Sequence, residues 1–121
     1  MPRLPIATTL LALCLNSAWA AAPQAGSTCL QALGSPAAVL ETAAHHDFRH
    51  QRYAAAYGRY ARLADAGHAP SAERALFMLL NGQALFASEW TATEKQQACW
   101  NALLVARARE RVALNHNPAG D

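Results

Sequence analysis

The chain has 121 residues, which suffices for one small domain and is too short for two. Hydrophobic residues make up 53% of it, but 30 residues are alanine, so few large apolar side chains remain to build a core. A formal net charge of +2 does not favour nucleic-acid binding, and the composition excludes collagen-like, low-complexity and disulfide-dense proteins.

The first 20 residues have the layout of a secretory signal peptide. Arg3 supplies positive charge, residues 4–15 are mainly apolar, and Ala18 and Ala20 are small residues at positions −3 and −1 of a cleavage site. The apolar stretch is shorter than the roughly 20 residues that cross a bilayer, and a bulky leucine before Cys14 disfavours a lipoprotein anchor. The alternative is a first core helix. We expect cleavage after Ala20 and a periplasmic or secreted protein that does not span the membrane.

Two cysteines, Cys29 and Cys99, remain after the expected cleavage. In an exported chain two cysteines predict one disulfide, and closing so long a loop contributes roughly 4 kcal/mol of stability in the chain-entropy estimate. The alternative is a pair of unpaired buried thiols.

The mature segment is rich in alanine, leucine, arginine and glutamine and poor in β-branched residues, which predicts an all-α domain. Residues 21–34 contain proline, glycine and serine and are expected to form a flexible lead that carries Cys29. Ser35 is the expected N-cap of a first helix, with Pro36 at its first position, and this helix is expected to end near Ala44.

A longer second helix is expected to start at Asp47 as N-cap and to end at Gly67, which favours the left-handed conformation after a helix. Tyr53, Tyr57 and Tyr60 recur at helical spacing and predict its buried face. Gly58 lies within this helix, and we expect a neighbouring backbone to approach it closely.

The third helix is expected to run from residue 72 to Asn81-Gly82, which should end it. An apolar connector at residues 85–90 leads to a fourth helix, whose N-cap is either Thr91 with Glu94 or Thr93 with Gln96. This helix is expected to reach residue 114, so that the helical domain covers residues 35–114, and residues 115–121 should fray.

The segment from Tyr57 to Ala69, YGRYARLADAGHA, resembles the first helix and turn of a Sel1-like repeat, which is related to the tetratricopeptide repeat. Residues 72–82 resemble its second helix. The resemblance covers a single degenerate repeat at about residues 53–88, with an antiparallel hairpin at about 53–82. It implies a bundle of about four helices that makes protein–protein contacts rather than performing catalysis.

Basic side chains along one side of the second helix are the candidate partner-binding residues. They are Arg49, Arg52, Arg59 and Arg62. Such a row favours an acidic protein surface or an anionic lipid head group, and the alternative is an ordinary solvated helix face.

His46 and His50 lie four residues apart, a spacing that can chelate zinc or copper. No third ligand is evident nearby in the sequence, so a solvated helix end is the alternative interpretation. The arginines around Glu110 are interpreted as solvated charges at a helix end.

Catalytic motifs are not found: the carboxylates are scattered singly, and there is no Ser-His-Asp elbow, HExxH or glycine-rich phosphate loop. We therefore expect no enzymatic activity and no cofactor. Aromatic residues at helical spacing are expected to fill the core rather than a ligand site: Tyr53, Tyr57, Tyr60, Phe77, Phe86, Trp90 and Trp100. The leading hypothesis is an exported helical module with a protein partner in the cell envelope and no nucleic-acid partner. The alternative is a periplasmic carrier of a metal or an anion.

Overall fold

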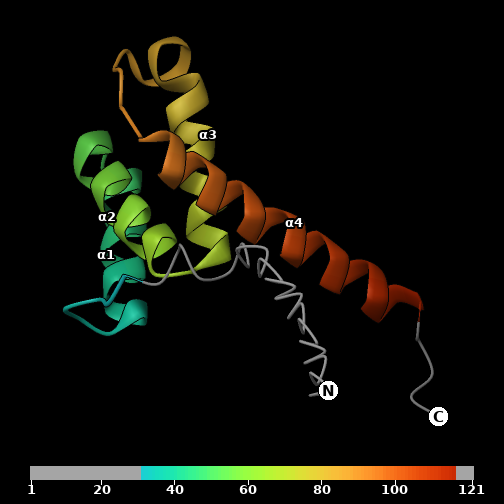
Figure 1. Ribbon diagram of the computed structural model, residues 1–121. Coiled ribbons are helices and arrows are strands. Elements are labelled where there is room, and N and C mark those ends of the chain that lie inside the picture. The colour runs from blue at the N-terminus through green and yellow to red at the C-terminus, as the bar shows by residue number, and fades with distance from the viewer. Residues whose placement is uncertain (1–30, 117–121) are drawn as a thin grey trace, which may run out of the picture.

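The computed structural model describes residues 31–116, which form four helices and no strand (Figure 1). The helices are α1 (Ala37–Arg49), α2 (Tyr53–Asp65), α3 (Ala69–Phe86) and α4 (Glu94–His116). The predicted all-α class and the number of helices are confirmed for this part of the chain. The predicted signal peptide, the lead up to residue 30 with Cys29, and residues 117–121 lie outside the described residues.

The break between α1 and α2 lies later in the chain than predicted. α1 continues past Ala44 to Arg49, and Asp47 is buried within it instead of capping the second helix. The helix begins without a side-chain cap, so the predicted cap at Ser35 is wrong. The chain reverses at Gln51, which takes a left-handed conformation with φ of 59°. Because neither glycine nor proline marks this reversal, the local sequence gave no signal for it.

Gly67 ends α2 as predicted, but α3 begins at Ala69, three residues before the predicted residue 72. Gly67 has a φ of 93°, the left-handed conformation that glycine adopts without a Cβ clash. Its backbone N–H donates to the carbonyl of Ala64 at 3.0 Å, and that of His68 donates to Leu63 at 3.0 Å. These bonds close the end of α2 in the expected way, and α1, α2 and α3 then run up, down and up beside one another (Figure 1).

The predicted end of the third helix at Asn81-Gly82 is wrong, because α3 continues through both residues to Phe86. The close backbone approach that was expected at Gly58 occurs at Gly82 instead. No atom of another element lies within 4 Å of a Cβ built on Gly58, whereas one built on Gly82 would meet the backbone oxygen of Ser88 and the ring of Trp90. The connector after α3 therefore folds back across Gly82.

The start of α4 confirms one of the two predicted caps. The backbone N–H of Gln96 donates to Thr93 Oγ1 at 3.1 Å, and the N–H of Thr93 donates to Gln96 Oε1 at 3.0 Å. This reciprocal pair is a capping box. At its other end the helix continues through His116, so the expected fraying at residues 115 and 116 is wrong.

The core lies around α2, where α1, α3 and the first turns of α4 pack against it. Trp100 and Tyr60 are its largest fully buried side chains, and Asp65 receives hydrogen bonds from Trp100 Nε1 at 2.9 Å and Gln96 Nε2 at 3.0 Å. These contacts fasten α4 to α2. The prediction that Phe77 lies in the core is wrong, since this side chain is 43% exposed.

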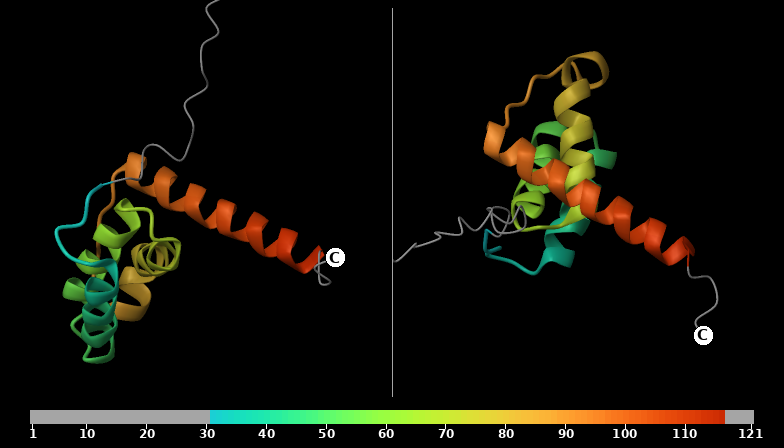
Figure 2. Two further views of the ribbon diagram at one scale, coloured as in Figure 1. Left: turned by 90° about the horizontal axis from the view of Figure 1, so that it is seen from below. Right: turned by 45° about the vertical axis from the view of Figure 1, so that its right-hand side comes forward.

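Beyond its first turns α4 leaves the other helices and projects from the body of the molecule (Figure 2). No helix among the described residues is both long and apolar enough to cross a membrane.

Candidate functional site

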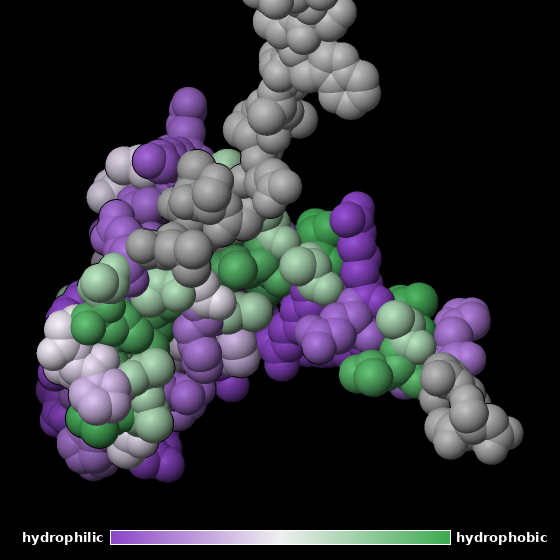
Figure 3. All heavy atoms as spheres, turned by 60° about the horizontal axis from the view of Figure 1, so that its bottom comes forward, coloured by the Kyte–Doolittle hydropathy of each residue, from purple (hydrophilic) through white to green (hydrophobic). Residues whose placement is uncertain are grey.

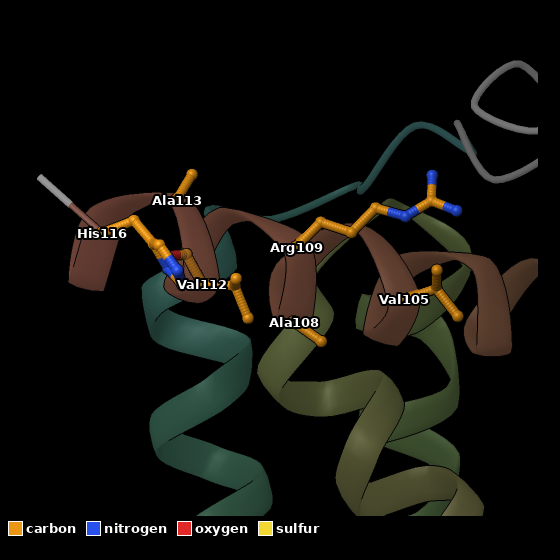
Figure 4. Close-up of a pocket in the computed structure, with 6 residues that line it drawn as sticks. All are labelled: Val105, Ala108, Arg109, Val112, Ala113 and His116. Atoms are coloured by element: carbon orange, nitrogen blue, oxygen red, sulfur yellow. The ribbon is translucent and has the colours of Figure 1, made fainter.

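The projecting half of α4 carries an apolar stripe that no other described element covers. Val105, Ala108 and Val112 follow one another at spacings of three and four, which places them on one face of the helix. Val105 is 50% exposed and Val112 57% exposed. Figure 4 shows the residues that line a shallow hollow here, with Arg109 extending along the helix toward Val105.

The hollow on α4 shares a lining residue with a second hollow, which in turn shares one with a third on α3. Ala108 also lines a hollow with Leu104, Arg107, Arg111 and Glu73. Glu73 in turn lines a third hollow on α3 together with Arg74 and Phe77. We call these three adjoining hollows, from Phe77 on α3 to Val112 on α4, the α3–α4 groove.

Charge in the α3–α4 groove is predominantly positive. Its arginines are Arg74, Arg107, Arg109 and Arg111, and its acidic side chain is Glu73. Glu73 is already engaged, because Arg107 Nη1 donates to its Oε2 at 3.1 Å. Within residues 31–116 the other three arginines form no ion pair. Figure 3 shows polar and apolar side chains interleaved along the projecting helix.

The four arginines that were predicted to bind a partner do not form one free surface. Arg52 donates from Nε and Nη2 to Asp47 Oδ1 at 2.9 and 2.6 Å, and Arg59 forms an ion pair with Asp47 Oδ2. Asp47 is 4% exposed, so these two arginines neutralise a buried carboxylate and join α1 to α2. Arg49 and Arg62 are exposed.

The structure brings His46 and His50 together, with ring centroids 4.2 Å apart. Their surroundings oppose a bound cation. Arg52 Nη2 lies 2.8 Å from His46 Nδ1, and since arginine only donates, this nitrogen accepts and the neutral ring carries its proton on Nε2. Among the described residues, no three His, Cys, Asp or Glu side chains are placed to hold a metal ion.

The pKa of His46 is lowered from its ordinary value of 6.5. The nearby imidazole of His50 is the main cause, followed by desolvation and by the charges of Arg52, Arg49 and Arg59. The folded protein therefore disfavours protonated His46. The contribution of neutral His46 to the free energy of unfolding is therefore present above pH 6.5 and is lost as the pH falls below that value.

A titration of the imidazole protons by NMR checks this shift. We expect His46 to titrate below pH 6.5, and we expect His50→Gln to move its pKa upward because the substitution removes the main cause. Arg62→Gln is the control, since Arg62 is not among the causes. An unchanged pKa of His46 in the His50 variant would show that desolvation and the arginines set it without His50.

A second polar cluster was not predicted from the sequence, and it joins α1 to the turn between α2 and α3. The carboxylate of Glu41 lies between two imidazoles, 3.5 Å from His45 Nε2 and 3.7 Å from His68 Nε2. The other ring nitrogens bond hydroxyls: His45 Nδ1 lies 2.7 Å from the Tyr60 hydroxyl, and His68 Nδ1 lies 2.8 Å from Ser71 Oγ.

This cluster contains a serine, a histidine and a glutamate in contact, the residue types of a hydrolytic triad. However, Ser71 is only 1% exposed, so its hydroxyl faces the protein interior and not a substrate. Burial also raises the pKa of Tyr60, which keeps its hydroxyl protonated. The geometry suits a hydrogen-bonded link between helices. No sequence motif predicts this link, because its members are brought together only when α1 packs beside the turn between α2 and α3.

Comparisons with known proteins found no match: no family model, no curated protein and no solved structure matches this chain.

Proposed function

We propose that the protein is an exported helical module that binds another protein. The observation that carries this proposal is the α3–α4 groove, in which apolar side chains lie exposed on a helix that projects from the body. Exposed apolar surface of this kind is characteristic of interaction sites. The proposal includes the Sel1-like nature of the α2–α3 hairpin, which its antiparallel helices and the left-handed Gly67 support.

The alternative function, a carrier of metal or anions at His46 and His50, has less support. Arginines flank both histidines, and a positive field repels a metal cation. An anion would compete with Asp47, with which Arg52 and Arg59 are already paired.

Export and the disulfide between Cys29 and Cys99 belong to the same proposal. Cys99 is 4% exposed and lines a hollow together with Gln31 and Asp65. The N–H of Gln31 donates to the carbonyl of Asp65 at 3.0 Å, which holds the chain beside Cys99 only two residues after Cys29. Two residues span at most about 7 Å, so the position of Gln31 supports a pairing of Cys29 with Cys99. Mass spectrometry of the protein from its source cells should find an amino terminus at Ala21 and both cysteines protected from alkylation until reduction.

Site-specific crosslinking tests whether the groove binds a protein. A photoreactive benzophenone amino acid at Val112 should give a discrete crosslinked protein in the cell envelope, and the same group at Arg62 should not. The Arg62 position is a matched control, because it is exposed and helical but lies outside the groove. A crosslink from position 62 alone would show that the partner binds at the arginines on α2 and not at the groove. The absence of a crosslink from both positions would overturn the proposed function.

A further inference from the structure

We infer that the α3–α4 groove binds an acidic amphipathic helix of the partner protein. This inference rests on the proposed function and specifies the chemistry of the partner. It starts from the arrangement of the two helices: α4 crosses α3 and then projects from the body (Figure 2), and hollows lie on both helices beside this crossing. Arg107 on α4 and Glu73 on α3 meet at this crossing.

The floor of the groove suits the apolar face of a helix. Leu104, Ala108 and Val112 recur at a spacing of four, and Val105 lies beside them. Alanine at the centre permits a close approach of a second backbone, while the valines on either side supply apolar contact. The stretch from Leu104 to His116 is about 18 Å long. A partner helix of about three turns would cover it.

Charge decides which helix fits. Arg109 and Arg111 flank Ala108, one in each of the two hollows that meet there, and neither forms an ion pair within residues 31–116. Arg74 lies at the α3 end of the groove and adds a third cation that forms no ion pair with the described residues. A partner helix with Asp or Glu beside its apolar stripe would pair with these guanidinium groups, which are suited to bidentate contacts with carboxylates.

A second copy of the chain fits this surface less well. Two α4 helices packed along the same stripe would bring Arg109 and Arg111 of one copy beside the same arginines of the other, and like charges in close contact are repulsive.

Selection from a library of displayed helical peptides tests the inference. Each peptide has 18 residues with a fixed apolar stripe of leucine and alanine and variable flanking positions, and the target is the full mature chain. We expect the selected peptides to be enriched in Asp and Glu at the flanks. The double variant Arg109→Glu/Arg111→Glu should bind them at least about tenfold more weakly, since a charged contact is replaced by repulsion.

The matched control is Arg49→Glu/Arg62→Glu, which makes the same change of charge at two exposed arginines outside the groove. It should leave peptide binding within about twofold. Equal losses in the two double variants would mean that only net charge matters and would overturn the inference. So would selected peptides with neutral or basic flanks, or a selection that enriches none.

Two further measurements test the alternative occupants of the groove, a second copy of the chain and a membrane. Self-association in sedimentation velocity that Val112→Asp abolishes would assign the groove to a second copy, and cosedimentation with phosphatidylglycerol vesicles that the same variant abolishes would assign it to a membrane. Failure of the inference differs from failure of the proposed function. If Val112 crosslinks to a protein without an acidic helix, the proposed function stands and the inference is wrong. If the acidic peptides bind but no crosslink forms in cells, the groove has the inferred preference for acidic helices and the proposed function is wrong.

Discussion

Replacing Trp100 with alanine is expected to lower the free energy of unfolding by about 4 kcal/mol. Trp100 is completely buried in the core cluster, and its indole N–H donates to Asp65 Oδ1 at 2.9 Å. The substitution leaves a cavity and removes a hydrogen-bond donor from a carboxylate that also holds Gln96. A domain of this size has about 5 to 10 kcal/mol of stability in total. Urea unfolding followed by circular dichroism should therefore show a large shift or a chain that is already unfolded.

Trp100→Phe keeps the result measurable if the alanine variant does not fold. It retains much of the apolar volume and loses the indole N–H, so we expect an intermediate loss of about 2 kcal/mol. Val112→Ala is the control on the same helix, because this side chain is 57% exposed and its truncation should change the free energy of unfolding by less than about 0.5 kcal/mol. A loss of less than about 1 kcal/mol in Trp100→Ala would contradict the docking of α4 onto α2.

Those parts of the fold that depend only on residues close together in the sequence were predictable. The left-handed Gly67 and the Thr93–Gln96 capping box each need only a short segment with the right side chains, and both were found. The turn at Gln51 was not predictable, because glutamine rarely adopts a positive φ and no glycine or asparagine marks the position. Asp47 was mistaken for a cap because its carboxylate is a good cap acceptor. In the folded chain it accepts from Arg52 instead.

The candidate site was less predictable, because it depends on the packing of whole helices. Val105 and Val112 have the spacing of a core stripe, and only the path of α4 away from the body leaves them exposed. In the same way, Arg52 and Arg59 have the spacing of a free basic face, but α1 brings a buried carboxylate between them. Exposure and charge compensation are thus set by tertiary contacts that a periodic pattern does not contain.

Gly82 shows the same dependence on tertiary contacts, and its substitution is the second one for which we expect a large effect on stability. Gly82→Ala is expected to lower the free energy of unfolding by about 1 to 2 kcal/mol net, because the steric cost exceeds the gain in helix propensity. The new Cβ would overlap the carbonyl oxygen of Ser88 and would lie 3.1 Å from the Trp90 ring. Ser88 also donates its N–H to the carbonyl of Gly82 at 3.2 Å, so the connector has little freedom to move away.

Gly58→Ala makes the same chemical change in the middle of α2, where no atom of another element lies within 4 Å of the new Cβ. There only the gain in helix propensity remains, and we expect the free energy of unfolding to rise by about 0.5 to 1 kcal/mol. Urea unfolding of the two variants should therefore give shifts of opposite sign. Stabilisation by Gly82→Ala would mean that the connector does not pack across α3, whereas destabilisation by Gly58→Ala would place an unseen neighbour on the exposed side of α2.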